Sequence, residues 1–178
     1  MLLEMRWPGA GIAVVGLVLA AGLAGMNVGY AQDSAAGKRE ATMQHATGSF
    51  DVKVAPQKAD NPQAEAAVLG RMSLDKQFHG DLEATSQGEM LSVLDKDKGS
   101  GGYVAMERVT GKLGGKSGSF VLQHNATMNR GVPEMNIIVV PDSGTGELTG
   151  ISGSMKIRIE SGGKHFYDFE YTLDGAGH

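Results

Sequence analysis

Hydrophobic and polar residues alternate along the segment 117–130. Its even positions carry Phe120, Leu122, His124, Ala126 and Met128, whereas its odd positions are mostly polar. Side chains that point to two faces in turn are typical of a β-strand with one buried face. We therefore predict a strand here, with a histidine set into an inward-facing apolar row.

The same period of two recurs along most of the chain. It is found in the segments 43–54, 70–80, 81–94, 103–113, 151–160 and 165–173, and 135–140 is a nearly continuous apolar run. Short turns rich in glycine join these segments, and no stretch between them has the length of a crossover helix. The pattern predicts an all-β fold of about eight strands, arranged as an antiparallel barrel or sandwich. We favour an eight-stranded antiparallel β-barrel because closure leaves no strand edge unpaired.

Two charged residues fall within the predicted strands. The register of 70–80 turns Lys76 inward together with Met72, Leu74 and Phe78. In 103–113, apolar and polar side chains occupy both faces, so the pattern does not decide whether Glu107 points into the barrel. Tyr103 shares the face of Glu107, whichever face that is.

The N-terminal segment differs from the rest in having no charge between residues 8 and 31. Its apolar centre and the small residues Gly29 and Ala31 predict a signal peptide, 1–31, and initiation at Met5 would remove the acidic Glu4 from its start. The alternative is an uncleaved membrane anchor. We expect a periplasmic or secreted protein with a disordered linker at 32–42, a barrel domain at 43–173 and a disordered tail at 174–178.

Composition excludes several kinds of partner and chemistry. The net charge of −4 is spread without basic clusters, which argues against nucleic-acid binding. The chain has no cysteine, so disulfides, thiol nucleophiles and thiolate metal sites are excluded. The five histidines form no close ligand pair, and we expect neither a metal nor a cofactor. Membrane contact is expected only through an uncleaved signal segment.

The glycine-rich segment 141–150 has two interpretations. Its backbone N–H groups suit an anion-binding nest. Alternatively, Asp142, Ser143 and Thr145 cap backbone N–H groups in a structural turn while Leu148 closes one end of a barrel. We favour the structural turn.

Four segments, 78–86, 103–109, 118–124 and 142–148, together resemble the bacterial domain of unknown function family 3224. The resemblance covers roughly residues 43–173. It implies an eight-stranded barrel similar to plant allene oxide cyclase and to lipocalins, with a central cavity and a homodimeric state. The family supplies no established activity.

An interior that contains Lys76, Tyr103, Glu107 and His124 would join four groups able to shift one another's pKa and to move protons. Alternatively, Glu107 pairs with a cation and the groups only fix the register, in a purely structural barrel. A binding barrel would hold a small apolar or amphipathic ligand, and its expected lining is Phe120, Leu122, His124, Met128, Tyr167 and Phe169. Fold analogy alone raises a further alternative, an isomerase or cyclase that uses Glu107 or His124. Whether the protein is an enzyme stays open at this stage.

Overall fold

The computed structural model describes residues 42–59, 61, 63 and 68–173. The predicted signal peptide, the linker except Thr42, and the tail lie outside the described residues, so these boundaries stay predictions. Within the described part, no helix has the length and apolar character needed to cross a membrane.

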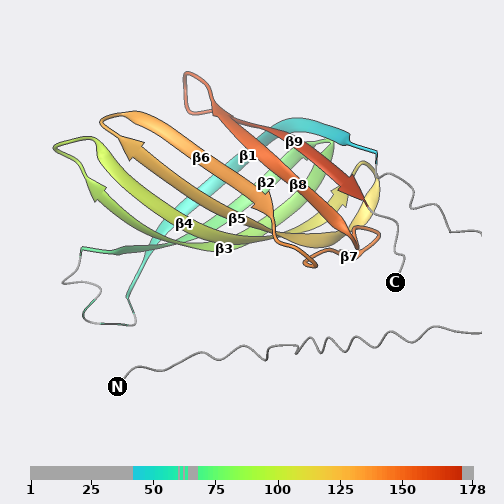
Figure 1. Cartoon of the computed structure of the whole chain (residues 1–178), viewed down its shortest axis with the longest axis horizontal. Helices are drawn as coiled ribbons and strands as arrows, with labels where there is room; N and C mark the ends of the chain where they lie inside the picture. Colours follow the sequence, from blue (N-terminus) through green and yellow to red (C-terminus); the bar gives the residue numbers. More distant parts are fainter. Residues whose placement is uncertain (1–41, 60, 62, 64–67, 174–178) are drawn as a thin grey trace, which may run out of the picture. The chain divides into compact units, whose positions relative to one another are not determined.

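In the described part of the chain, eight long strands and one short strand form a single antiparallel sheet (Figure 1). They are β1 (Gln44–Gln57), β2 (Gly70–Gly80), β3 (Leu82–Asp95), β4 (Ser100–Leu113), β5 (Lys116–Asn129), β6 (Val132–Val139), the two-residue β7 (Thr145–Gly146), β8 (Ile151–Ile159) and β9 (His165–Leu173). Each long strand pairs with two neighbours in the order β1-β2-β3-β4-β5-β6-β8-β9, and β9 pairs with β1. The prediction of a closed eight-stranded antiparallel barrel is confirmed.

The register of β2 to β5 runs without a bulge. Met72 pairs with Met90, Met90 with Ala105, and Ala105 with His124, which places these residues in one row across four strands. Because a shift of one residue would exchange the two faces of a strand, an unbroken register keeps every second residue on the interior. The inward row predicted for 117–130 therefore lies inside the barrel, with its first three members buried.

One end of the barrel, which we call the closed half, is filled with side chains. Leu82 after the β2–β3 turn and Leu113 before the β4–β5 turn are fully buried, and so is Leu148 from the segment after β7. Ser143 and Thr145 accept hydrogen bonds at 3.0 Å from the backbone N–H groups of Val121 and Ser119 on β5. The segment 141–150 therefore closes this end of the barrel, and its hydroxyls tie it to β5 as well as to its own backbone.

The other end, which we call the open half, is not filled to the same degree. Met128 and Met135 occupy inward positions of β5 and β6, yet they are 41% and 42% exposed. Met72, Met90 and Tyr103, which also face inward, are only partly buried. Solvent therefore reaches the inner face of the barrel from this end.

Candidate functional site

A buried ionised carboxylate, Glu107, lies at the boundary between the two halves. Its side chain points into the barrel and has no exposed surface. Glu107 Oε2 accepts a hydrogen bond from Lys76 Nζ at 2.6 Å, and Oε1 accepts one from the hydroxyl of Ser86. His124 Nε2 lies 2.9 Å from Oε2. These four residues, which we call the charge cluster, come from the adjacent strands β2, β3, β4 and β5.

The pairing of the strands explains how the cluster forms. Lys76 lies directly opposite Ser86, and Glu107 lies opposite Gly88, two residues further along β3. A β-carbon at Gly88 would come within 2.4 Å of the carbonyl oxygen of Met106 and 3.1 Å of Glu107 Cβ. Because glycine leaves this space empty, β3 and β4 approach closely and the Glu107 side chain extends to Ser86 and Lys76.

Two aromatic rings lie near the ammonium group of the cluster lysine. Lys76 Nζ lies 5.0 Å from the ring centroid of Phe50 and 5.7 Å from that of Phe78. The electron-rich face of an aromatic ring attracts a cation, and this attraction is stronger where water is excluded. The carboxylate and the two rings together compensate the ammonium group for its loss of hydration.

Opposing effects act on the pKa of Glu107. Burial raises the pKa, but the contacts with His124, Lys76 and Ser86 outweigh burial and lower the pKa from 4.5 to about 2. Glu107 is therefore ionised at neutral pH. A carboxylate with so low a pKa is a weak base, and it is poorly matched to removing a proton from a substrate near pH 7.

His124 adds a ring nitrogen that has no hydrogen-bond partner among the described residues. Its Nε2 lies close to Glu107 Oε2, but the contact does not have the geometry of a hydrogen bond. The side chain is 2% exposed, and an unsatisfied buried polar atom is rare in native proteins.

Tyr103 lies two inward positions from Glu107 on β4, with Ala105 between them, toward the open half. Burial and the negative charge of Glu107 both raise the pKa of Tyr103, so its hydroxyl stays protonated at neutral pH. Among the described residues no hydrogen bond to this hydroxyl is found. The phenol is therefore a donor on the inner face of the barrel without an acceptor.

The structure brings three of the four candidate residues, Lys76, Glu107 and His124, into direct contact, and it places Tyr103 on the same inner face, two inward positions from Glu107. It also resolves the orientation of Glu107, which is inward. Sequence reasoning missed Ser86 as a member of the cluster, although its inward position within an alternating strand was a usable signal. In the described part of the chain, no group of three or more His, Asp or Glu side chains is arranged to hold a metal ion.

The expected lining of a ligand cavity is divided between the two halves of the barrel. Four of the predicted lining residues belong to the well-packed core of the closed half: Phe120, Leu122, Tyr167 and Phe169. Tyr167 also donates a hydrogen bond to the carbonyl of Thr47 and accepts one from the N–H of Leu82, which ties the closed half together. Only Met128 lies in the open half, and His124 lies at the boundary.

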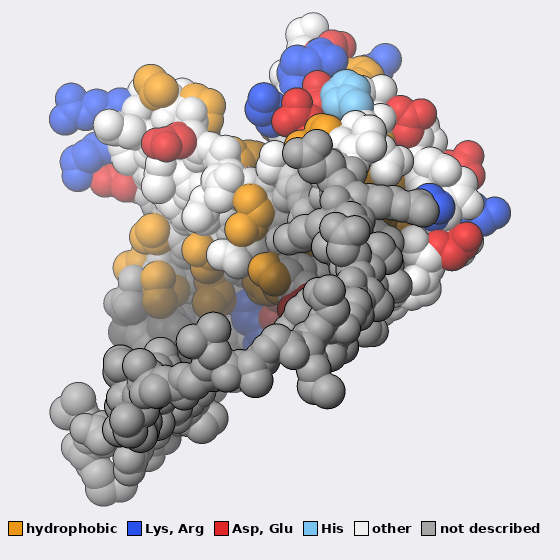
Figure 2. Space-filling view, turned by 45° about the vertical axis from the view of Figure 1, so that its right-hand side comes forward, with side chains coloured by type: hydrophobic (Ala, Val, Ile, Leu, Met, Phe, Trp, Pro, Cys, Tyr) orange, Lys and Arg blue, Asp and Glu red, His pale blue; other side chains and the backbone are white. Residues whose placement is uncertain are grey.

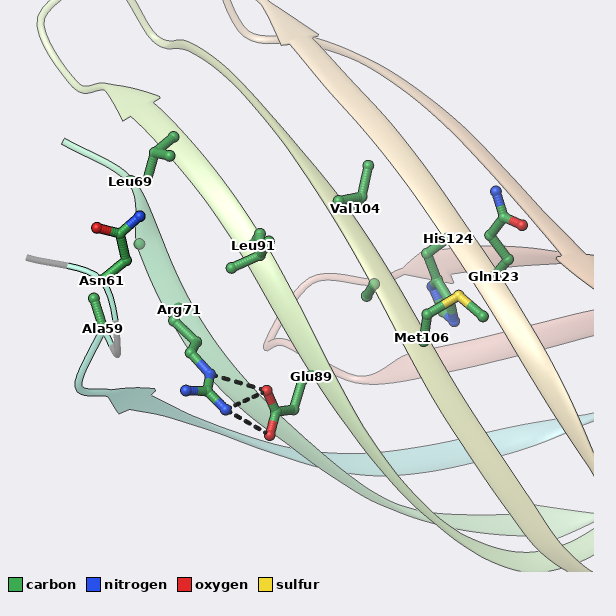
Figure 3. Close-up of a pocket in the computed structure, with 12 residues that line it drawn as sticks. Ala59, Asn61, Leu69, Arg71, Glu89, Leu91, Val104, Met106, Gln123 and His124 are labelled. Atoms are coloured by element: carbon green, nitrogen blue, oxygen red, sulfur yellow. Dashed lines mark hydrogen bonds and ion pairs between the residues drawn. The ribbon is translucent and has the colours of Figure 1, made fainter. Parts of the chain in front are cut away.

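A groove of about 590 Å³ runs over β2, β3, β4 and β5, and its lining includes His124 of the charge cluster (Figure 3). Its apolar part is formed by exposed side chains, and Arg71 and Glu89 form an ion pair at 2.8 Å at one side of it. The principal apolar residues are Leu69, Leu91, Val104 and Met106. In the view of Figure 2, hydrophobic side chains gather at the lower left of the described surface, whereas charged side chains occupy its upper parts. The homodimer implied by the family resemblance stays a prediction.

Comparison with known proteins supports the resemblance noted in the sequence. Residues 46–171 match the family model described as "Protein of unknown function (DUF3224)". The chain is also similar to a crystal structure of a protein with unknown function from the DUF3224 family of Shewanella oneidensis MR-1. The two are 51% identical, the match covers 74% of this chain and 98% of that chain, and the TM-score is 0.67. No curated protein matches the chain.

Proposed function

The chain belongs to the DUF3224 family of proteins of unknown function, and on this premise we propose that its barrel binds a small amphipathic ligand in the open half. One observation carries the proposal. Inward-facing side chains of the open half remain accessible to solvent, and the same inner face ends at a buried charge cluster. The apolar chain of a ligand can lie along the open half while its polar group reaches the charge cluster.

The composition of the open half supports this role. Four of its inward positions carry methionine: Met72, Met90, Met128 and Met135. Methionine is unbranched and polarisable, so it adapts to ligands of different shape better than branched or aromatic side chains do. The closed half, in contrast, already has the dense packing of a protein core and offers a ligand no room without rearrangement.

Ligand binding is better supported than an isomerase or cyclase activity. That alternative requires Glu107 or His124 to transfer a proton. Lys76, Ser86 and His124 together lower the pKa of Glu107 to about 2, which removes the best carboxylate from consideration as a base at neutral pH. The cluster has the properties of a fixed polar wall that orients a bound molecule.

We place this binding activity in the periplasm or outside the cell, on the basis of the uncharged segment 8–31. Trp7 is the only tryptophan of the chain. Cleavage after Ala31 would therefore leave a mature protein without tryptophan emission. The intact mass of the exported protein tests the predicted cleavage site. An exported form that retains Trp7 would support a membrane anchor instead.

The methionines provide a direct test of ligand binding. In protein labelled with ¹³C at the methionine methyl groups, we expect octanoate or methyl octanoate to shift the signals of Met72, Met90, Met128 and Met135. Met106 on the outer face and the buried Met155 of the closed half serve as internal controls. If neither compound, nor octylamine, shifts the four inward-facing methionines, or if only Met106 responds, the open half is not a binding site.

A further inference from the structure

The balance of hydrogen-bond donors and acceptors in the cluster restricts what a ligand can present to it. Both oxygens of the Glu107 carboxylate are already engaged, Oε1 by Ser86 and Oε2 by Lys76. His124 Nε2 also crowds Oε2 at 2.9 Å. The acceptor capacity of this carboxylate is therefore largely used within the protein.

Donors, by contrast, are in excess. An ammonium group has three N–H donors, and among the described residues Lys76 has one hydrogen-bond acceptor, Glu107, while Phe50 and Phe78 lie on its other side. The buried Nε2 of His124 has no hydrogen-bond partner among the described residues, and it is a further donor when it carries the ring proton. The hydroxyl of Tyr103, which lies nearest to the open half, has no acceptor among the described residues.

A ligand that enters from the open half therefore meets donors first. An amine would find both oxygens of the Glu107 carboxylate already engaged and only hydroxyl groups, such as that of Tyr103, left to accept its hydrogen bonds, so its hydration would be replaced only in part. An oxygen acceptor would satisfy a donor that now lacks a partner. Because Lys76 and Glu107 neutralise each other, both a charged carboxylate and a neutral carbonyl are compatible with the cluster.

We infer that the ligand of the open half carries an oxygen acceptor, as a carboxylate or a carbonyl group, and that the hydroxyl of Tyr103 donates a hydrogen bond to it. This inference rests on the proposed function and specifies its chemistry. The apolar remainder of the ligand lies against the inward-facing methionines. Tyr103 contributes to affinity and orientation and carries out no chemical step.

Three probes with the same eight-carbon chain test the inference: octanoate, methyl octanoate and octylamine. We expect isothermal titration calorimetry with the full chain at pH 7 to show that octanoate, methyl octanoate or both bind at least about tenfold more tightly than octylamine. The comparison between octanoate and methyl octanoate shows whether the preferred acceptor is the anion or the neutral carbonyl.

The matched variant is Tyr103→Phe, which removes the hydroxyl and keeps the ring. We expect it to weaken the better acceptor probe about fivefold and to weaken octylamine by a smaller factor. The inference would be overturned if octylamine bound as tightly as the acceptor probes, or if the Tyr103→Phe variant kept full affinity for those probes. In either case the proposed binding site would stand. Methionine signals that respond to none of the three probes would instead overturn the proposed function itself.

Discussion

The two halves of this barrel share the same strands but differ in what their inner faces do. In the closed half, aromatic rings pack against one another, with centroids 5.7 Å apart for Phe120 and Phe169 and 5.2 Å apart for Phe169 and Tyr171. In the open half, methionines occupy the equivalent inward positions and keep part of their surface in contact with solvent. One set of strands thus provides both a core that stabilises the fold and an inner surface that remains available to a ligand.

The charge cluster lies where these two regions meet. A buried ion pair contributes little to stability compared with an apolar replacement, yet removal of one partner is costly because a charge is left without compensation. The cluster is therefore costly to disrupt, as the closed half is, although it borders the open half. Experiments can separate the contribution of the cluster to stability from its proposed contribution to ligand binding.

The largest effect is expected from Glu107→Ala. This change leaves the buried Lys76 without its carboxylate, and we expect the free energy of unfolding to fall by roughly 3 to 5 kcal/mol in chemical denaturation. Glu107→Gln is the control that keeps the shape and removes the charge. A loss below about 0.5 kcal/mol for Glu107→Ala, the size of most surface effects, would show that the cluster plays no part in stability.

A pair of truncations compares the halves directly. Leu113→Ala in the closed half should lower the free energy of unfolding by about 2 to 5 kcal/mol, because it leaves a cavity in a packed region. Met128→Ala in the open half should cost less than about 1 kcal/mol, because its side chain is already partly solvated. Urea denaturation of both variants measures the contrast, and equal losses would contradict the division into two halves.

The pH dependence of stability should report on Glu107. Its pKa is lowered from 4.5 to about 2 in the folded state, so the unfolded chain binds this proton first as the pH falls. The stabilisation is fully present above about pH 5 and is lost as the pH falls toward 2, by about 3 kcal/mol in total. Denaturation curves between pH 5 and pH 2 should be less steeply pH-dependent for Glu107→Gln than for the wild type; parallel curves would show that other groups dominate.

The smallest effect on stability is expected from Tyr103→Phe. The hydroxyl makes no hydrogen bond within the described part of the protein, so its removal should change the free energy of unfolding by less than about 0.5 kcal/mol. A thermal or chemical unfolding curve measures this. A loss above 1 kcal/mol would mean that the hydroxyl stabilises the folded barrel, and Tyr103 would then belong with the structural residues.

The sequence alone determined which residues share a strand face. Alternation with a period of two placed Phe120, Leu122 and His124 on one inward row and turned Lys76 toward the same interior, as the structure confirms. Alternation is a property of the extended backbone itself, so it can be recognised without knowledge of the neighbouring strands. The number of such segments and the turns between them predicted a barrel or a sandwich, and closure of the strand edges and the family resemblance favoured the barrel.

Only the tertiary structure decided the rest. Val104 and Met106 are apolar but lie on the outer face, which concealed the inward orientation of Glu107 in its strand. Met128 shares the inward face of Phe120 and is nevertheless exposed, because alternation identifies the face of a strand but not where packing across the barrel ends. The contacts of Glu107 with Lys76, Ser86 and His124 depend on the register of four strands and on the close approach of β3 and β4 at Gly88. The pattern within one strand contains no information on either.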